Sequence, residues 1–316
     1  MHPVLDSIQQ VVQVAQFVRF DDAAAQTFVK NHLDQVDVLS AWSVDDHFND
    51  GTDRTLNYVF VLDTLNFCFW GEPRWKYRHQ GQLLNGYMAL AACLKDAFER
   101  GDPLDDARYL SQLTLPQAEV LLAGEEGQIP LLDSRLRVLR EAGKSLLEHF
   151  DGEVTNLVKQ ANGSALSLVE LLADHFVSYR DEANYRGFHV CFYKRAQIFC
   201  ADVYGTFKGQ GWGAFHDVDQ LTAFADYKLP QLLRAHNVLH YEPSLTEKVD
   251  AQVELPMGSS EEIEIRTFTI YAVEQLKQMF ADHNVHLKSF EVDWLLWHLS
   301  QGMEAKPYHR TRTVFY

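Results

Sequence analysis

Apolar residues recur at intervals of three and four along most of the chain, which predicts a protein built largely from amphipathic α-helices. Several of these stripes open on a capping residue or stop at a glycine or proline, as helices do. We therefore expect helices over residues 3–20, 22–34, 82–100, 105–112, 116–123, 131–150, 164–176, 259–280 and 290–301.

Three stretches depart from this pattern. Residues 56–70 are almost continuously apolar or aromatic, and periodicity alone fits a buried helix or a strand. Residues 71–81 alternate around Trp75 and Tyr77 between turn signals, which predicts a short hairpin. Residues 217–236 are expected to form a helix–turn–helix, with the sequence ADYKLP at its turn.

The sequence shows no sign of a boundary between domains. The sequence has no internal repeat, low-complexity segment or proline-rich linker. We therefore predict one compact domain over residues 1–316 that is mostly α with minor β.

The net charge of the chain limits the kinds of molecule that the protein can bind. The formal net charge of the 316 residues is −16, whereas a protein that grips a nucleic-acid backbone needs a basic face. We expect no nucleic-acid partner, although a local basic cluster could still bind a small anionic substrate. The hydrophobic content of 47% is ample for a core.

The four cysteines lie among apolar neighbours without a C-x-x-C pair, which predicts reduced, buried thiols. Residues 1–13 lack the features of a signal peptide, and no apolar run approaches the ~20 residues that span a bilayer. The expectation is a cytoplasmic monomer without a membrane partner. His236 and His240 are four residues apart but have no third ligand, so we expect no bound metal.

Two carboxylates stand out because their surroundings are apolar or aromatic. Asp202 lies within CFYKRAQIFCADVYG and Asp226 within LTAFADYKLPQLLR. A buried carboxylate is costly unless it is paired or lines a cavity. Asp202 could simply pair with Lys194 or Arg195, and Asp226 could cap the helix that contains Pro230.

Three further clusters are candidates for binding. Asn66, Phe67, Phe69 and Trp70 could hold a flat heterocycle or could pack in the core. Asp181 and Glu182 could accept hydrogen bonds from amines and hydroxyls, or could be a solvated loop.

The stretch 306–316 contains no acid and includes Lys306, His309, Arg310 and Arg312, which suit a phosphate monoester or a solvated tail. Lys228, beside Tyr227, and Arg266 are alternative phosphate ligands.

The stretches KRAQIFCADVYG and ADYKLPQLLR resemble the signature sequences of the queuosine salvage protein family, the queuosine 5'-phosphate N-glycosylases. LDTLNFCFW, YRDEA and the run from EEIEIR through DWLLWHLSQ to YHRTRTVFY are similar to the same family. The resemblance covers the chain from about residue 60 onwards. It implies a fold like that of the helix-hairpin-helix DNA glycosylases.

The resemblance also implies an activity, which is hydrolysis of the N-glycosidic bond of queuosine 5'-monophosphate to release queuine, without cofactor or metal. It makes Asp202 the nucleophile or general base and Asp226 its partner, although the two roles could be exchanged. The implied substrate-binding residues are Asn66, Phe67, Phe69, Trp70, Asp181, Glu182, Tyr204, Tyr227, Lys228, His309, Arg310 and Arg312. The alternatives are a base-specific glycosylase that acts on nucleic acid and a non-catalytic binder of queuosine nucleotides.

Overall fold

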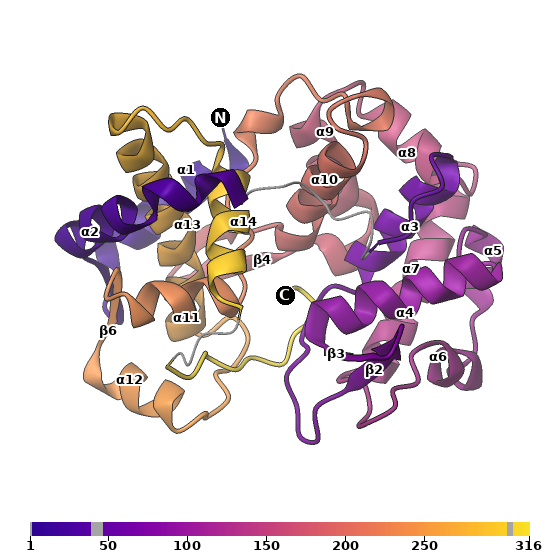
Figure 1. Ribbon diagram of the computed structural model, residues 1–316, viewed down its shortest axis with the longest axis horizontal. Coiled ribbons are helices and arrows are strands. Elements are labelled where there is room, and N and C mark those ends of the chain that lie inside the picture. Colours follow the sequence, from indigo (N-terminus) through magenta and orange to yellow (C-terminus); the bar gives the residue numbers. More distant parts are fainter. Residues whose placement is uncertain (1, 39–46, 302–305) are drawn as a thin grey trace.

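The computed structural model describes residues 2–38, 47–301 and 306–316 (Figure 1). α-Helices account for most of this part of the chain, which confirms the mostly α prediction. They are α1 (Pro3–Val14), α2 (Asp22–His32), α3 (Asp53–Thr64), α4 (Gly86–Arg100), α5 (Ala107–Gln112), α6 (Leu115–Leu121), α7 (Leu132–His149), α8 (Val154–Gln160), α9 (Ala165–His175), α10 (Lys194–Thr206), α11 (Lys228–Ala235), α12 (Pro243–Asp250), α13 (Ser260–Asp282) and α14 (Ser289–Leu299).

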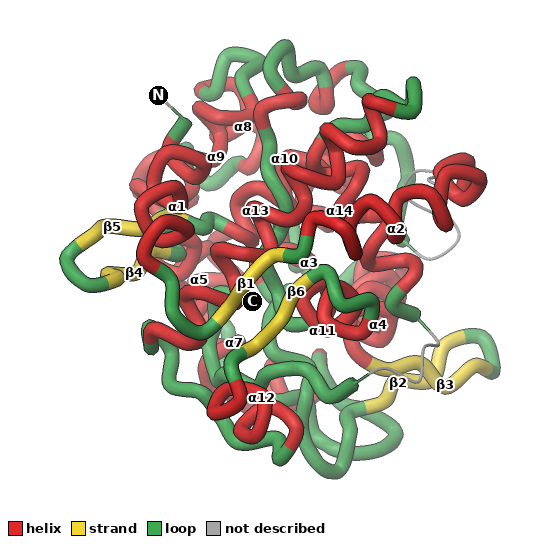
Figure 2. The backbone as a smooth tube through the Cα atoms, turned by 90° about the vertical axis from the view of Figure 1, so that its left-hand side faces the viewer, coloured by secondary structure: helices red, strands yellow, loops and turns green. Residues whose placement is uncertain are grey.

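The strands of the described residues form three small antiparallel ribbons. β1 (Val18–Phe20) pairs with β6 (Leu239–Tyr241), and Figure 2 shows this ribbon joining distant parts of the sequence. β2 (Lys76–His79) pairs with β3 (Gln82–Asn85), and β4 (Glu182–Tyr185) pairs with β5 (Phe188–Cys191). These ribbons are the minor β component that the sequence predicts.

Two groups of helices lie side by side in Figure 1. In one group the N-terminal helices α1 and α2 pack against α13, which also contacts α11 and α14. In the other group α10 packs against α3 and α9, and α7 packs against α5 and α6. One continuous hydrophobic core runs through both groups.

A buried carboxylate explains why the first helix is shorter than its apolar stripe predicts. The Glu264 side chain on α13 accepts hydrogen bonds from the backbone N–H groups of Gln16, Phe17 and Val18 at 3.0, 2.6 and 3.1 Å. Residues 18–20 then pair with β6 instead of continuing the helix. The expectation of one helix over residues 3–20 is therefore wrong beyond Val14.

Other boundaries also differ from the predictions. Residues 53–64 are helical, but the rest of the apolar run to residue 70 is loop. The hairpin is β2–β3, so the helix expected from residue 82 begins only at Gly86. In the stretch 217–236, a short 3₁₀ turn (Val218–Gln220) and an extended segment precede α11, so the first α-helix of the expected helix–turn–helix is absent from this stretch.

All four cysteines are buried and unpaired, as the sequence predicts. Among the residues that the structure describes, no helix has both the length and the apolar composition needed to cross a bilayer.

The role of Glu264 yields a stability prediction. Glu264→Ala removes the acceptor of three backbone N–H groups and of the Tyr185 hydroxyl, which donates to it at 2.6 Å. A stranded buried donor costs about 1–3 kcal/mol, so the free energy of unfolding should fall by at least about 3 kcal/mol in urea titrations. Gln278→Ala, on the exposed side of the same helix, is the control. An equal effect of both variants would contradict the assignment.

Candidate active site

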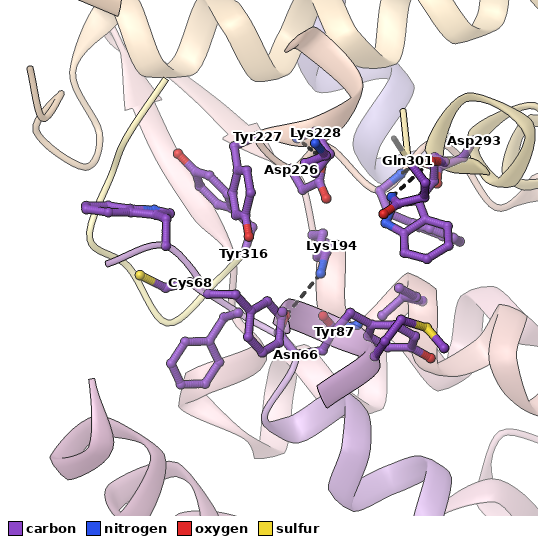
Figure 3. A pocket seen from close by; sticks show the side chains of 18 of the residues that line it. Asn66, Cys68, Tyr87, Lys194, Asp226, Tyr227, Lys228, Asp293, Gln301 and Tyr316 are labelled. Atoms are coloured by element: carbon purple, nitrogen blue, oxygen red, sulfur yellow. Dashed lines mark hydrogen bonds between the residues drawn. The ribbon is translucent and has the colours of Figure 1, made fainter. Parts of the chain in front are cut away.

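A cavity of about 560 Å³ lies where the two groups of helices meet. One side of it comes from the loop after α3, the start of α4 and one face of α10. The other side comes from residues 224–228, α14, Tyr308 and Tyr316. Figure 3 shows the Lys194 side chain between Asp226 and Asn66, with its ammonium directed towards the Asn66 carbonyl. The size suits a ligand such as a nucleotide.

Carboxyl groups dominate the interior of this cavity. Asp202, Asp226 and Asp293 line it, and Asp63 is fully buried outside the lining. Lys194 interacts electrostatically with all four, and its ammonium donates a hydrogen bond to the Asn66 carbonyl at 3.0 Å. Lys194 therefore interacts with all four acids, while Arg195 also acts on Asp63 and Lys228 also acts on Asp226.

Asp202 belongs to α10 and has an exposed fraction of only 4%. No described residue donates a hydrogen bond to its carboxyl group, which leaves both oxygens available to a ligand. Burial raises the pKa of Asp202 well above its usual range, and the charges of Asp63 and Asp293 raise it further. The Lys194 ammonium opposes this rise without cancelling it. The predicted ion pair with Arg195 is absent from the described contacts, because Arg195 donates to the carbonyls of Thr64 and Ser178.

Asp226 serves as a helix cap and also lines the cavity. Its Oδ1 accepts hydrogen bonds from the N–H groups of Lys228 and Leu229 at 2.7 and 3.1 Å, at the start of α11. Burial raises the pKa of the Asp226 carboxyl, while Lys194 and these two N–H donors lower it. The capping interpretation of Asp226 is confirmed, and it does not exclude a second role for the other oxygen.

Asp293 and Asp63 were not predicted from the sequence. Asp293, on α14, accepts a hydrogen bond from the Phe224 N–H at 2.7 Å, and burial together with the Asp226 charge raises its pKa well above the usual range. Asp63, in the last turn of α3, has one oxygen unpartnered among the described residues, and burial raises its pKa to about 7. Both lie in apolar stretches, so the criterion that selected Asp202 would also have selected them.

Aromatic rings form much of the wall. Phe69 and Trp70 line it as predicted, together with Tyr87, Tyr227, Trp294, Trp297 and Tyr308. The Tyr227 and Tyr308 rings lie 4.9 Å apart on one side, and Tyr87 meets Trp297 edge-on at 5.9 Å on another. The sequence motif around Asn66 therefore supplies only part of the aromatic surface, and the rest comes from remote segments.

Phe67 and Tyr204 are placed differently from the other predicted aromatics. Phe67 lines the cavity but is 1% exposed, with the Arg135 guanidinium 4.4 Å from its ring, so it also belongs to the core. Tyr204 lies outside the lining and packs against Phe290 and Lys288. A direct substrate contact by Tyr204 does not fit this placement.

The basic tail does not supply the cations of the cavity. Arg312 pairs with Glu254 at 3.0 Å and, like Arg310, lies beside the Trp70 ring outside the lining. Burial and the Arg266 charge lower the pKa of His309 to about 3, so its imidazole is neutral. The expectation that His309, Arg310 and Arg312 grip a phosphate directly does not fit this geometry.

Arg74 and Lys228 are the cations that accompany Lys194 in the lining, as far as the structure describes the chain. Arg74 is exposed, and none of the described residues is a hydrogen-bond partner of its side chain. The Lys228 ammonium donates to Gln231 at 2.8 Å and lies 6.0 Å from the centre of the Tyr308 ring. Burial and the nearby Arg74 charge lower the pKa of Lys228, which indicates that the two cations share one part of the cavity.

Asp181 and Glu182 lie outside the lining, contrary to their predicted contact with substrate. Asp181 makes a two-pronged ion pair with Arg266 at 2.8 and 2.5 Å, and both side chains are buried. Glu182 accepts hydrogen bonds from Tyr193 at 2.6 Å and is bonded to His189 at 3.0 Å. Arg266, a predicted alternative phosphate ligand, is thus occupied by Asp181.

Comparison with known sequences identifies the family. The sequence model described as queuosine salvage protein matches residues 46–316. The chain is 47% identical to the queuosine 5'-phosphate N-glycosylase/hydrolase of Sphaerobacter thermophilus over 316 residues, which cover 99% of this chain and 97% of that protein. The chain belongs to the queuosine salvage protein family.

Relatives of the same name occur in eukaryotes. This queuosine salvage protein is 40% identical to the one from Dictyostelium discoideum, with 84% of this chain and 79% of the relative covered. It is 36% identical to the one from Mus musculus, with 84% and 82% covered. The match to the family model, residues 46–316, includes every residue that lines the cavity.

The raised pKa of Asp202 predicts how stability changes with pH in this queuosine salvage protein. An unfolded aspartate releases its proton near pH 3.9, whereas folded Asp202 holds its proton to higher pH, so the group lowers stability as pH rises through that window. Asp202→Asn should therefore stabilise the fold at pH 7 and have little effect below about pH 4.

The measurement is the free energy of unfolding of both proteins at a series of pH values. The exposed Asp174→Asn is the matched control for the loss of one carboxyl group. A gain for Asp202→Asn that does not depend on pH would show that its carboxyl group is not held protonated.

Proposed function

We propose that this protein hydrolyses the N-glycosidic bond of queuosine 5'-monophosphate and releases queuine. The names of its relatives support the activity, and the carboxyl groups of Asp202 and Asp226 in an aromatic cavity carry the proposal on structural grounds. Arg74 and Lys228 supply positive charge for a phosphate in the same cavity.

The chemistry explains why carboxylates are needed. Cleavage of an N-ribosidic bond builds positive charge on the anomeric carbon, and a nearby carboxylate stabilises that charge or activates the attacking water. The leaving base of this substrate is a 7-deazaguanine, so the enzyme cannot assist departure by protonating a nitrogen at position 7. Stabilisation of the sugar cation and positioning of the substrate must then account for most of the rate.

Asp202 is the carboxylate that we assign to the reacting centre. Its oxygens have no hydrogen-bond donor among the described residues, and its raised pKa makes its ionised form a stronger base than an ordinary aspartate. Asp226 is its partner or an anchor for the ribose, with one oxygen held by the cap of α11. Lys194 offsets part of the charge of the acids and so helps to keep one of them ionised.

The proposed substrate explains the remaining lining. Phe69, Trp70, Tyr227 and Trp297 offer faces on which a base can stack, and stacking contributes about 1–3 kcal/mol per base. Arg74 and Lys228 are suited to the 5'-phosphate, with the Tyr308 hydroxyl as a further donor. Arg310 and Arg312, which were predicted to bind the phosphate, would then hold the Trp70 and Tyr308 rings in place through cation–π contacts.

Several sequence expectations stay predictions. These are a glycosylase-like single domain, independence of metal, and action as a cytoplasmic monomer without nucleic acid. Incubation of the protein with queuosine 5'-monophosphate, followed by chromatography for free queuine, tests the proposed activity directly. Binding of the nucleotide without release of base would leave a nucleotide-binding protein instead of an enzyme.

Asp202→Asn tests the catalytic assignment. It keeps the shape of the side chain but removes the charge and the base, so kcat should fall by about 10²–10⁴-fold while substrate binding survives. In the wild type, the acid limb of kcat/KM should lie above the ~3.9 of an ordinary aspartate. Asp226→Asn is the parallel variant, and normal turnover by Asp202→Asn with loss in Asp226→Asn would exchange the two roles.

A double substitution of Arg74 and Lys228 by Ala tests the phosphate contact. The KM for the monophosphate should rise at least about tenfold, because charge-assisted hydrogen bonds to charged groups contribute about 1.5–3 kcal/mol each. The low rate on the free nucleoside should hardly change. Arg137→Ala, an exposed cation on α7 outside the lining, is the matched control. An increase in KM for Arg312→Ala but not for the double variant would indicate that the tail binds the phosphate.

A further inference from the structure

The β4–β5 hairpin gathers three side chains of metal-ligating types on one face. Glu182 and Cys191 are directly paired in the register of the two strands, and His189 lies two residues before Cys191 on the same face of β5. One ligand atom from each of the three lies within 4.8 Å of the other two. None of the three residues lines the cavity described above.

The separations are close to those of a metal site. A ring nitrogen of His189 lies 3.7 Å from the Cys191 sulfur, and the other lies 3.0 Å from a Glu182 oxygen. Tetrahedral zinc with bonds of about 2.3 Å to sulfur and 2.0 Å to nitrogen holds those two ligand atoms about 3.5 Å apart. Because the two contacts use different ring nitrogens and only one nitrogen can bind the ion, the decisive value is the 4.8 Å within which one ligand atom of each residue lies. The separations must then shorten by at most about 1.3 Å, which rotation of the exposed His189 ring and of the Glu182 carboxylate can supply.

Access and support are also present. The His189 side chain is 63% exposed, which gives an ion a route in, whereas Cys191 is buried and fixed by the hairpin. The Tyr193 hydroxyl donates to Glu182 at 2.6 Å and orients its carboxylate. Such an outer partner typically strengthens metal binding by 10–100-fold.

We propose that Glu182, His189 and Cys191 bind a zinc ion, with water as the fourth ligand. A thiolate, an imidazole and a carboxylate form a donor set that zinc accepts in tetrahedral geometry. On binding, the Cys191 thiol releases its proton to solvent and the resulting thiolate ligates the ion. The ion would join the ends of β4 and β5 just before α10 begins, and it does not depend on the proposed function.

The probe is zinc chloride titrated into the metal-free full-length chain by calorimetry, with cobalt chloride as a spectroscopic substitute. One equivalent should bind, and cobalt should give the thiolate-to-metal absorption band that requires a sulfur ligand. His189→Ala and Cys191→Ser should each weaken zinc binding at least tenfold, and Cys191→Ser should abolish the band. His283→Ala, an exposed histidine on another element, should bind zinc like the wild type.

Two results would overturn the proposal. One is the absence of zinc binding by the wild type, which would leave Cys191, His189 and Glu182 as a hydrogen-bonded chain. The other is binding that His189→Ala does not weaken, which would place the ion elsewhere. Because His189 is exposed, its substitution decides the question even if Cys191→Ser does not fold.

Discussion

The position of the candidate site depends on the buried guanidinium of Arg266. It pairs with Asp181 at 2.8 and 2.5 Å and donates through Nε to the Ala225 carbonyl at 3.1 Å, directly before Asp226. Asp181 in turn accepts the Lys194 N–H at 3.2 Å, at the start of α10. A buried charge is tolerated only when its partners are complete. Here one partner, Ala225, directly precedes Asp226, and the other, Asp181, links Arg266 to the start of α10. One side chain therefore fixes the relative positions of Asp226, Lys194 and α10.

The cavity itself combines an acidic interior with a basic edge. Asp63, Asp202, Asp226 and Asp293 all interact with Lys194, whereas Lys228, next to Asp226, also interacts with the exposed Arg74 in the same lining. The proposed substrate has a negatively charged phosphate on its ribose and a positively charged amine on its base. It therefore carries a partner for the cations and for the carboxyl groups of the cavity. The electrostatic field and the shape of the cavity would then orient the substrate before the glycosidic bond breaks.

Sequence patterns predicted the parts of this protein that depend on local order. The stripes that became α7, α9, α13 and α14 were correct within a few residues because their apolar faces are continuous. The end of α1 could not be predicted, because it depends on Glu264, about 250 residues away. The same limit applies to the candidate site. Asp202 could be selected from the sequence because it is a charge in an apolar helix. No local pattern shows that Asp181 pairs with Arg266, or that Arg74 lines the cavity while the arginines of the tail do not.

The buried acids of this protein fall into two kinds. Some have all their hydrogen-bond partners and stabilise the fold, and others lack partners and remain open to a ligand. Glu264 has four donors and Asp181 has a complete ion pair, so each stabilises the fold and has no capacity left for a ligand. Asp202 has no donor among the described residues, and one oxygen of Asp63 has none either, so both groups are costly to bury when charged. The fold keeps these incomplete acids beside the cavity because rigid, fully paired neighbours hold them there. The same deficit leaves oxygens of these acids open to a ligand, and the catalytic role proposed for Asp202 rests on this opening.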